Sequence, residues 1–91
     1  MPTGVAGSTF ASELNRLANA GTYPTLNNYL SPEKAANVYA GTTNLPLIEA
    51  LNKKVDANRQ PSAYKALNAV CNEIAGTTNL SATTALRSIN L

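Results

Sequence analysis

Apolar residues recur at intervals of three and four along five stretches of the chain, which is the spacing of one face of an α-helix. The first stretch carries Phe10, Leu14 and Leu17, and a later one carries Ile48, Leu51 and Val55. No segment alternates apolar and polar residues over enough length to form a strand. The pattern predicts an all-α protein of five or six short helices, within residues 8–21, 31–41, 42–56, 62–76 and 77–91, with a further short one at best within 22–30.

Start and stop signals define the ends of several of these helices. Ser8 or Thr9 can cap the first helix, because a side-chain oxygen there accepts from backbone N–H groups that lack a helical partner. Ser31 is the predicted cap of a later helix, and Pro32 suits its first turn. Glycine ends many helices because it tolerates left-handed backbone. The predicted stops are Gly21, Gly41 and Gly76.

The hexapeptide AGTTNL occurs at residues 40–45 and again at residues 75–80, 35 positions later. The similarity extends without a gap over residues 36–51 and 71–86, and a degraded copy lies at residues 14–22. The chain is therefore predicted to consist of helix–turn–helix repeat units in which AGTTNL is the turn. Stacked units of this kind bury one continuous core between neighbours.

Each residue of the predicted turn has a mechanical role. The alanine allows two helices to approach closely, and the glycine reverses the backbone. A threonine hydroxyl or an asparagine side chain is expected to cap the next helix. The candidates for this capping role are Thr43, Asn44, Thr78 and Asn79. The asparagines that precede the glycine by four residues, Asn37 and Asn72, are predicted to bond the turn from inside, with Asn19 as an equivalent and solvent exposure as the alternative.

The apolar faces of the later helices, including Tyr64 on the helix predicted within residues 62–76, define a candidate core. Its predicted members are Leu51, Leu67, Val70, Cys71, Ile74 and Leu86. Cys71 lies in an apolar run, which favours a buried structural thiol over a reactive one, and a single cysteine cannot form an internal disulfide. Residues 8–91 are expected to form a single helical domain, and residues 1–7, which hold proline, glycine and small residues, an extended N-terminal arm.

The composition favours a protein that packs against neighbours. Only 13% of the 91 residues are charged, the formal net charge is +2, and asparagine and threonine are abundant. Interface cores are similarly depleted of charge. The basic residues are scattered, with Lys53 and Lys54 as the one adjacent pair, which argues against nucleic-acid binding.

No pattern of catalytic or ligand-binding residues stands out. The chain has no histidine and one cysteine, so no metal site is expected. The acidic residues are single and mostly at positions expected to face solvent, and neither a serine nor the cysteine has an evident base. The glycines do not form a phosphate-binding loop, and no apolar stretch is long enough to span a membrane. We therefore expect no enzymatic activity, no cofactor, no small-molecule substrate and no membrane insertion.

The unit N-x-x-A-G-T-T-N-L, a helix stop followed at once by a new helix, resembles a repeat of structural proteins from tailed bacteriophages and related prophages. The resemblance covers most of residues 36–91 and, faintly, residues 13–30. It implies a small, non-enzymatic virion protein on the head or tail, assembled in the host cytoplasm beside other virion proteins, as a homo-oligomer or in many copies. The alternative is a soluble helical-repeat adaptor that binds a protein partner.

Overall fold

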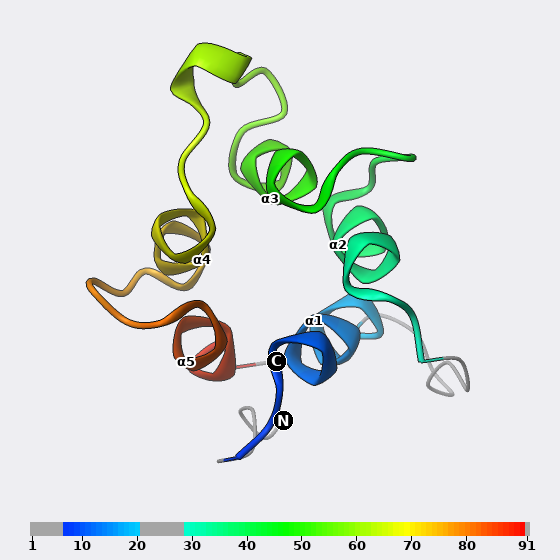
Figure 1. Cartoon of the computed structure of the whole chain (residues 1–91), viewed down its shortest axis with the longest axis vertical. Coiled ribbons are helices and arrows are strands. Elements are labelled where there is room, and N and C mark those ends of the chain that lie inside the picture. Colours follow the sequence, from blue (N-terminus) through cyan, green and yellow to red (C-terminus); the bar gives the residue numbers. More distant parts are fainter. Residues whose placement is uncertain (1–6, 21–28, 91) are drawn as a thin grey trace.

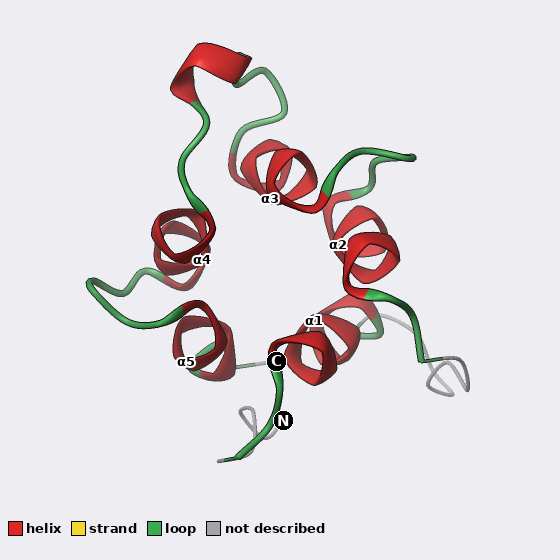
Figure 2. Ribbon diagram, in the orientation of Figure 1, coloured by secondary structure: helices red, strands yellow, loops and turns green. Residues whose placement is uncertain are grey.

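The structure is a computed structural model that describes residues 7–20 and 29–90. This part of the chain forms a ring of five α-helices (Figure 1). The helices follow the ring in sequence order, and the last packs against the first. They are α1 (Phe10–Ala18), α2 (Pro32–Ala40), α3 (Leu47–Val55), α4 (Leu67–Ala75) and α5 (Ala82–Arg87), with a short 3-10 turn, η1 (Pro61–Ala63), between α3 and α4. The described residues hold helices and no strands (Figure 2), which confirms the predicted all-α class.

Neighbouring helices meet near the same end at two of the junctions. The ammonium group of Lys54, near the end of α3, lies 4.5 Å from the centre of the Tyr39 ring, near the end of α2. At the other side of the ring, Nη2 of Arg16 in α1 donates to the carbonyl oxygen of Leu86 in α5 at 2.9 Å. At these two junctions, residues near the C-terminal ends of both helices are therefore in contact.

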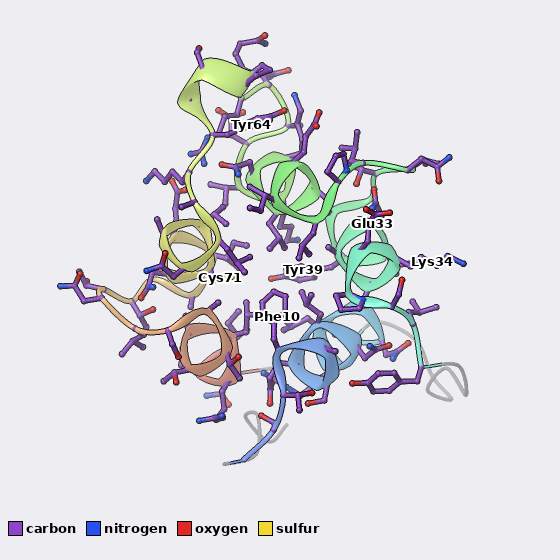
Figure 3. All side chains as sticks on the ribbon, in the orientation of Figure 1. Phe10, Glu33, Lys34, Tyr39, Tyr64 and Cys71 are labelled. Atoms are coloured by element: carbon purple, nitrogen blue, oxygen red, sulfur yellow. The ribbon has the colours of Figure 1, made fainter. Side chains whose placement is uncertain are left out.

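The core is built from the same two positions of every helix. The fourth and fifth residues of each helix are at most 2% exposed. They are Glu13 and Leu14, Ala35 and Ala36, Ala50 and Leu51, Val70 and Cys71, and Ala85 and Leu86. Phe10, Tyr39 and Cys71 point from three different helices into the centre of the ring (Figure 3). The mixture of small and large residues lets five helices converge on one axis.

Local signals explain where α1 and α2 begin and where α2 ends. Thr9 caps α1 in a reciprocal pair of bonds with Ser12, and Ser31 Oγ accepts from a backbone N–H in the first turn of α2. Pro32 is the first residue of α2. Gly41 ends α2 with φ at +73°, the left-handed conformation that favours glycine.

The helix predicted within residues 62–76 is shorter than expected. It begins at Leu67, and Tyr64, predicted on its apolar face, lies outside it. The physical reason is Asn52 of α3, which holds the backbone N–H and C=O of Lys65 and so keeps that residue out of a helix. The predicted core residues Leu67 and Ile74 are half-buried and pack against the core from its edge.

Two further predictions were wrong, and other predictions concern residues outside the described part of the chain. Ile48, expected on the buried stripe of α3, is 41% exposed, because α3 turns Ala50 and Leu51 toward the axis. Glu13, expected to face solvent, is buried. The described part of the chain does not include Gly21, most of the short helix predicted within residues 22–30, or residues 1–6 of the predicted arm.

Candidate functional site: asparagine clamps and turn grooves

Asn72, the sixth residue of α4, holds the turn that leads to α5. Its Nδ2 donates to the carbonyl oxygens of Asn68 and Leu80, both at 2.7 Å. Its Oδ1 accepts from the Thr77 hydroxyl at 2.8 Å and from the Leu80 backbone N–H at 3.1 Å. One side chain, 7% exposed, thus binds both backbone groups of the residue that precedes the N-cap Ser81. We call this arrangement an asparagine clamp.

The same clamp occurs in three other helices, always at the sixth helix residue. Asn37 binds the backbone N–H and C=O of Leu45 at 3.1 and 2.9 Å, and the Thr42 hydroxyl at 2.7 Å. Asn15 binds the same two groups of Leu30 at 2.7 and 2.9 Å. The fourth clamp joins Asn52 to Lys65 at 2.9 and 3.1 Å.

The prediction that asparagines bond the turns from inside is confirmed at two positions and wrong at a third. Asn37 and Asn72 do so, but the equivalent in α1 is Asn15 and not Asn19. Asn19 donates instead to a carbonyl oxygen of its own helix. Asn52 was missed altogether, because its sixth position in α3 becomes evident only once the structure shows that the helix starts at Leu47.

The repeated turn uses its residues differently from the prediction. Gly41 and Gly76 end α2 and α4 with φ of +73° and +72°. The prediction that the next helix is capped by Thr43 or Asn44, and by Thr78 or Asn79, was wrong. The caps are Pro46 for α3 and Ser81 for α5. The clamp explains the shift, because the leucine of each turn must extend past the asparagine before a helix can start, and Asn44 and Asn79 adopt φ of +57° and +59° on the way.

Each AGTTNL turn leaves an open groove against the helix before it. The groove at α4 has a volume of about 330 Å³, and the groove at α2 about 280 Å³. All eight lining positions correspond through the 35-residue repeat. Four are identical in the two grooves: the clamp asparagine and the Thr-Thr-Asn of the turn. The four that differ are Leu30, Glu33, Lys34 and Val38 at α2, against Lys65, Asn68, Ala69 and Glu73 at α4.

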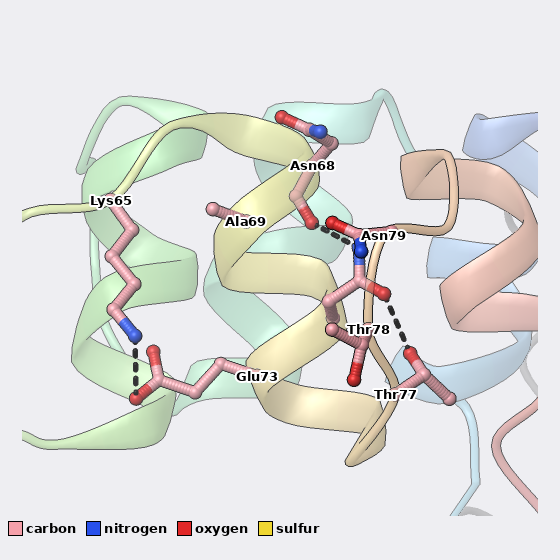
Figure 4. A pocket seen from close by; sticks show the side chains of 8 residues that line it. Lys65, Asn68, Ala69, Glu73, Thr77, Thr78 and Asn79 are labelled. Atoms are coloured by element: carbon pink, nitrogen blue, oxygen red, sulfur yellow. Dashed lines mark hydrogen bonds and ion pairs between the residues drawn. The ribbon is translucent and has the colours of Figure 1, made fainter.

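The α4 groove is lined by paired charges (Figure 4). Glu73 accepts two bonds from Arg59, both at 2.9 Å, and lies 3.4 Å from the ammonium group of Lys65. Arg59 also donates to Oδ1 of Asn52 at 3.0 Å, so it ties this groove to a clamp. The hydrogen bond from Arg59 lowers the pKa of Glu73, and the same bond raises the pKa of Arg59.

The α2 groove is more apolar on its rim. Val38 replaces Glu73 at the equivalent position and is 50% exposed. Leu30 lines the same groove, and its neighbour in the chain, Tyr29, is 65% exposed. The two grooves therefore share a polar framework but offer a neighbour different chemistry.

The remaining titratable groups of note are protected from solvent. Burial raises the pKa of the Cys71 thiol to about 11 and also raises the pKa of the Tyr39 hydroxyl. Among residues 7–20 and 29–90, no group of three histidine, cysteine, aspartate or glutamate side chains is arranged to hold a metal ion. No helix in this part of the chain is both long and apolar enough to span a bilayer.

Comparison of the chain with protein-family models, with curated proteins and with solved structures found no match. Inferences about function therefore start from the repeat, the clamps and the two grooves of this chain.

Proposed function

We propose that this protein is a non-enzymatic structural component of a tailed-bacteriophage virion, present in many copies on the head or tail and assembled in the host cytoplasm. The observation that carries the proposal is the duplicated turn. It resembles the repeat of phage structural proteins, and it builds the same groove twice, at α2 and at α4. A subunit with two grooves built on the same framework is suited to repeated contacts with neighbours in an assembly.

The surface chemistry of the turns supports a packing role. Thr43, Asn44, Thr78 and Asn79 are exposed, and all four are uncharged and polar. Such side chains can form hydrogen bonds across an interface without the desolvation penalty of a buried charge. The apolar side chain of Val38, which lines the α2 groove together with Thr43 and Asn44, would add buried area to such a contact.

The described residues also support the non-enzymatic part of the proposal. Glu73 is engaged by Arg59, and Cys71 is buried with its pKa raised. General acid–base catalysis needs a titratable group near its working pH and within reach of a substrate. Neither groove has a histidine or a cysteine among its lining residues, and the side-chain amides of Asn37 and Asn72 already form four hydrogen bonds each.

Mass spectrometry of purified particles tests the proposal. Phage particles from the source of the sequence would be banded twice in a density gradient and washed at high salt. The proposal expects peptides of this chain at a fixed ratio to the major head protein through every step. If the chain stays in the soluble lysate while the particles are complete, the virion role is wrong and the adaptor alternative is favoured.

A groove substitution then tests how the subunit docks. Val38→Glu gives the α2 groove the residue type of the α4 groove, at a position that is half-exposed and therefore tolerant. Incorporation into particles is expected to fall while the melting temperature stays near that of the wild type. Gln60→Glu adds the same charge at an exposed position outside both grooves and is the matched control. Equal incorporation of both variants would exclude the α2 groove as the contact.

The adaptor alternative is favoured by one observation, the exposure of Tyr29 beside the apolar rim of the α2 groove. Aromatic side chains are enriched at protein–protein interfaces. An adaptor would bind its partner in the soluble fraction, whereas a virion component would co-purify with the particles. The gradient experiment therefore separates the two functions.

A further inference from the structure

The junction between α5 and α1 closes the ring, and it is built differently from the other four. Within residues 7–20 and 29–90 these are the last and first helices, so no turn joins them, and the sixth residue of α5 is Arg87 in place of asparagine. Its Nε and Nη2 donate to the hydroxyl and the carbonyl oxygen of Ser8 at 3.3 and 3.4 Å. Ser8 precedes the N-cap Thr9, as Leu80 precedes Ser81, so Arg87 binds where a clamp asparagine would bind.

A second departure from the repeat lies at the same junction. The fourth residue is alanine or valine in the other helices, but in α1 it is Glu13, which is 2% exposed. Its carboxylate accepts from the Ser8 hydroxyl and from Nε of Arg16, the latter at 2.7 Å. Arg16 reaches across the junction to the Leu86 carbonyl, while its Nη1 is buried and has no hydrogen-bond partner among the described residues. An ionic network has thus replaced the amide clamp.

Three features favour opening of the ring at the α1–α5 junction. The bonds from Arg87 to Ser8 are near the upper limit of hydrogen-bond length. The attraction within the Glu13–Arg16 pair is offset by the desolvation of both charges. No covalent turn holds the two helices together once they separate. Native proteins open locally where such stabilisation is least.

We propose that the α1–α5 junction is a latch, with Arg87 as the residue that holds it shut. The ring opens there as a local event while the four asparagine clamps keep the other junctions closed. Opening exposes the edges of α1 and α5, including Leu14 and Leu86, which are otherwise fully buried.

Native-state hydrogen exchange of the full chain tests this proposal. In the wild type, amides of α1 and α5 should exchange faster than those of α3, although the central residues of all three helices are buried. Arg87→Ala should accelerate exchange in α1 and α5 by about tenfold and change α3 by less than about twofold, because only the local opening becomes easier. Asn37→Ala alters the same sixth position in α2 and is the matched control, expected to accelerate α3.

Two results would overturn the latch. One is wild-type exchange in α1 and α5 that is as slow as in α3. The other is an Arg87→Ala variant in which all helices accelerate by the same factor, because the junction would then open only with global unfolding. If Arg87→Ala does not fold, Arg87→Lys serves in its place, since a single ammonium group cannot reproduce the two bonds of the guanidinium group to Ser8.

Discussion

The asparagine clamp makes a quantitative prediction, which is sharpest at Asn72. The change Asn72→Ala removes all four hydrogen bonds of the side chain and leaves both backbone groups of Leu80 without their partner. A hydrogen bond contributes about 1 kcal/mol net. The better helix propensity of alanine offsets up to about 0.7 kcal/mol of the lost stability. Since the groove admits some water to the vacated groups, we expect a loss of about 3 kcal/mol in the free energy of unfolding.

Urea denaturation monitored by circular dichroism measures this loss. For a domain of this size, 1 kcal/mol corresponds to about 4–8 °C in melting temperature, so Tm should fall by about 12–24 °C. Asn68→Ala is the matched control, because that side chain is exposed and forms no hydrogen bond within the described residues. It should change stability by less than about 0.5 kcal/mol.

An isosteric variant separates the hydrogen bonds from the packing. Asn72→Asp keeps the shape but loses both donated bonds and sets a carboxylate against the carbonyl oxygens of Asn68 and Leu80. It should be at least as unstable as Asn72→Ala at neutral pH. If both variants unfold within about 0.5 kcal/mol of the wild type, the clamp does not hold the junction and the account of the ring is wrong.

Four other outcomes follow from the geometry. Gly76→Ala should lower the free energy of unfolding, measured by urea denaturation, by about 1 kcal/mol, because alanine is disfavoured at positive φ. Beyond the adjacent residues, no atom lies within 4 Å of the added methyl group, so no steric clash contributes. An unchanged midpoint would contradict this prediction. Leu86→Ala should cost about 2–5 kcal/mol by the same assay, and a smaller loss would mean that the core can close around the gap. Cys71 should react slowly with a thiol reagent at pH 8, because burial raises its pKa to about 11; rapid stoichiometric labelling would place it at the surface. Arg59 lowers the pKa of Glu73 below 4.5, so the stability that this pair contributes should be present above pH 4.5 and lost as the pH falls through the lowered pKa. In melting curves recorded over a series of pH values, Glu73→Gln should lose this part of the acid dependence. An unchanged profile would show that the pair is not stabilising.

Local sequence signals were sufficient where all the relevant groups lie close together in the chain. The helix from Pro32 to Ala40 could be predicted because its cap Ser31, its first-turn proline and its stop Gly41 are all adjacent to it. The inward role of Asn37 and Asn72 was also visible, because each bonds residues within eight positions. Such contacts are encoded in a short motif and need no knowledge of the rest of the fold.

The features that sequence analysis missed depend on distant partners. Asn52 binds Lys65, 13 positions away, through a connector that lacks the AGTTNL turn. Glu13 looked like a solvent-facing residue because the reason for its burial, the closure of α1 onto α5, joins Ser8 to Arg87 across 79 positions. Ring closure is a tertiary event, and no local pattern reports it.

The clamps also explain why the hexapeptide occurs twice and not four times. Four asparagines make the same pair of backbone bonds, but the chain returns to them after 8 residues at Asn37 and Asn72, 13 at Asn52 and 15 at Asn15. A return of eight residues needs three features within one short turn. They are a glycine with positive φ, a threonine hydroxyl that donates to the clamp asparagine, and a second asparagine with positive φ. Longer returns can reach the same end point with many sequences. AGTTNL is therefore the solution for the two tightest junctions, and the two matching grooves, on which the proposed docking depends, are a direct consequence of that tightness.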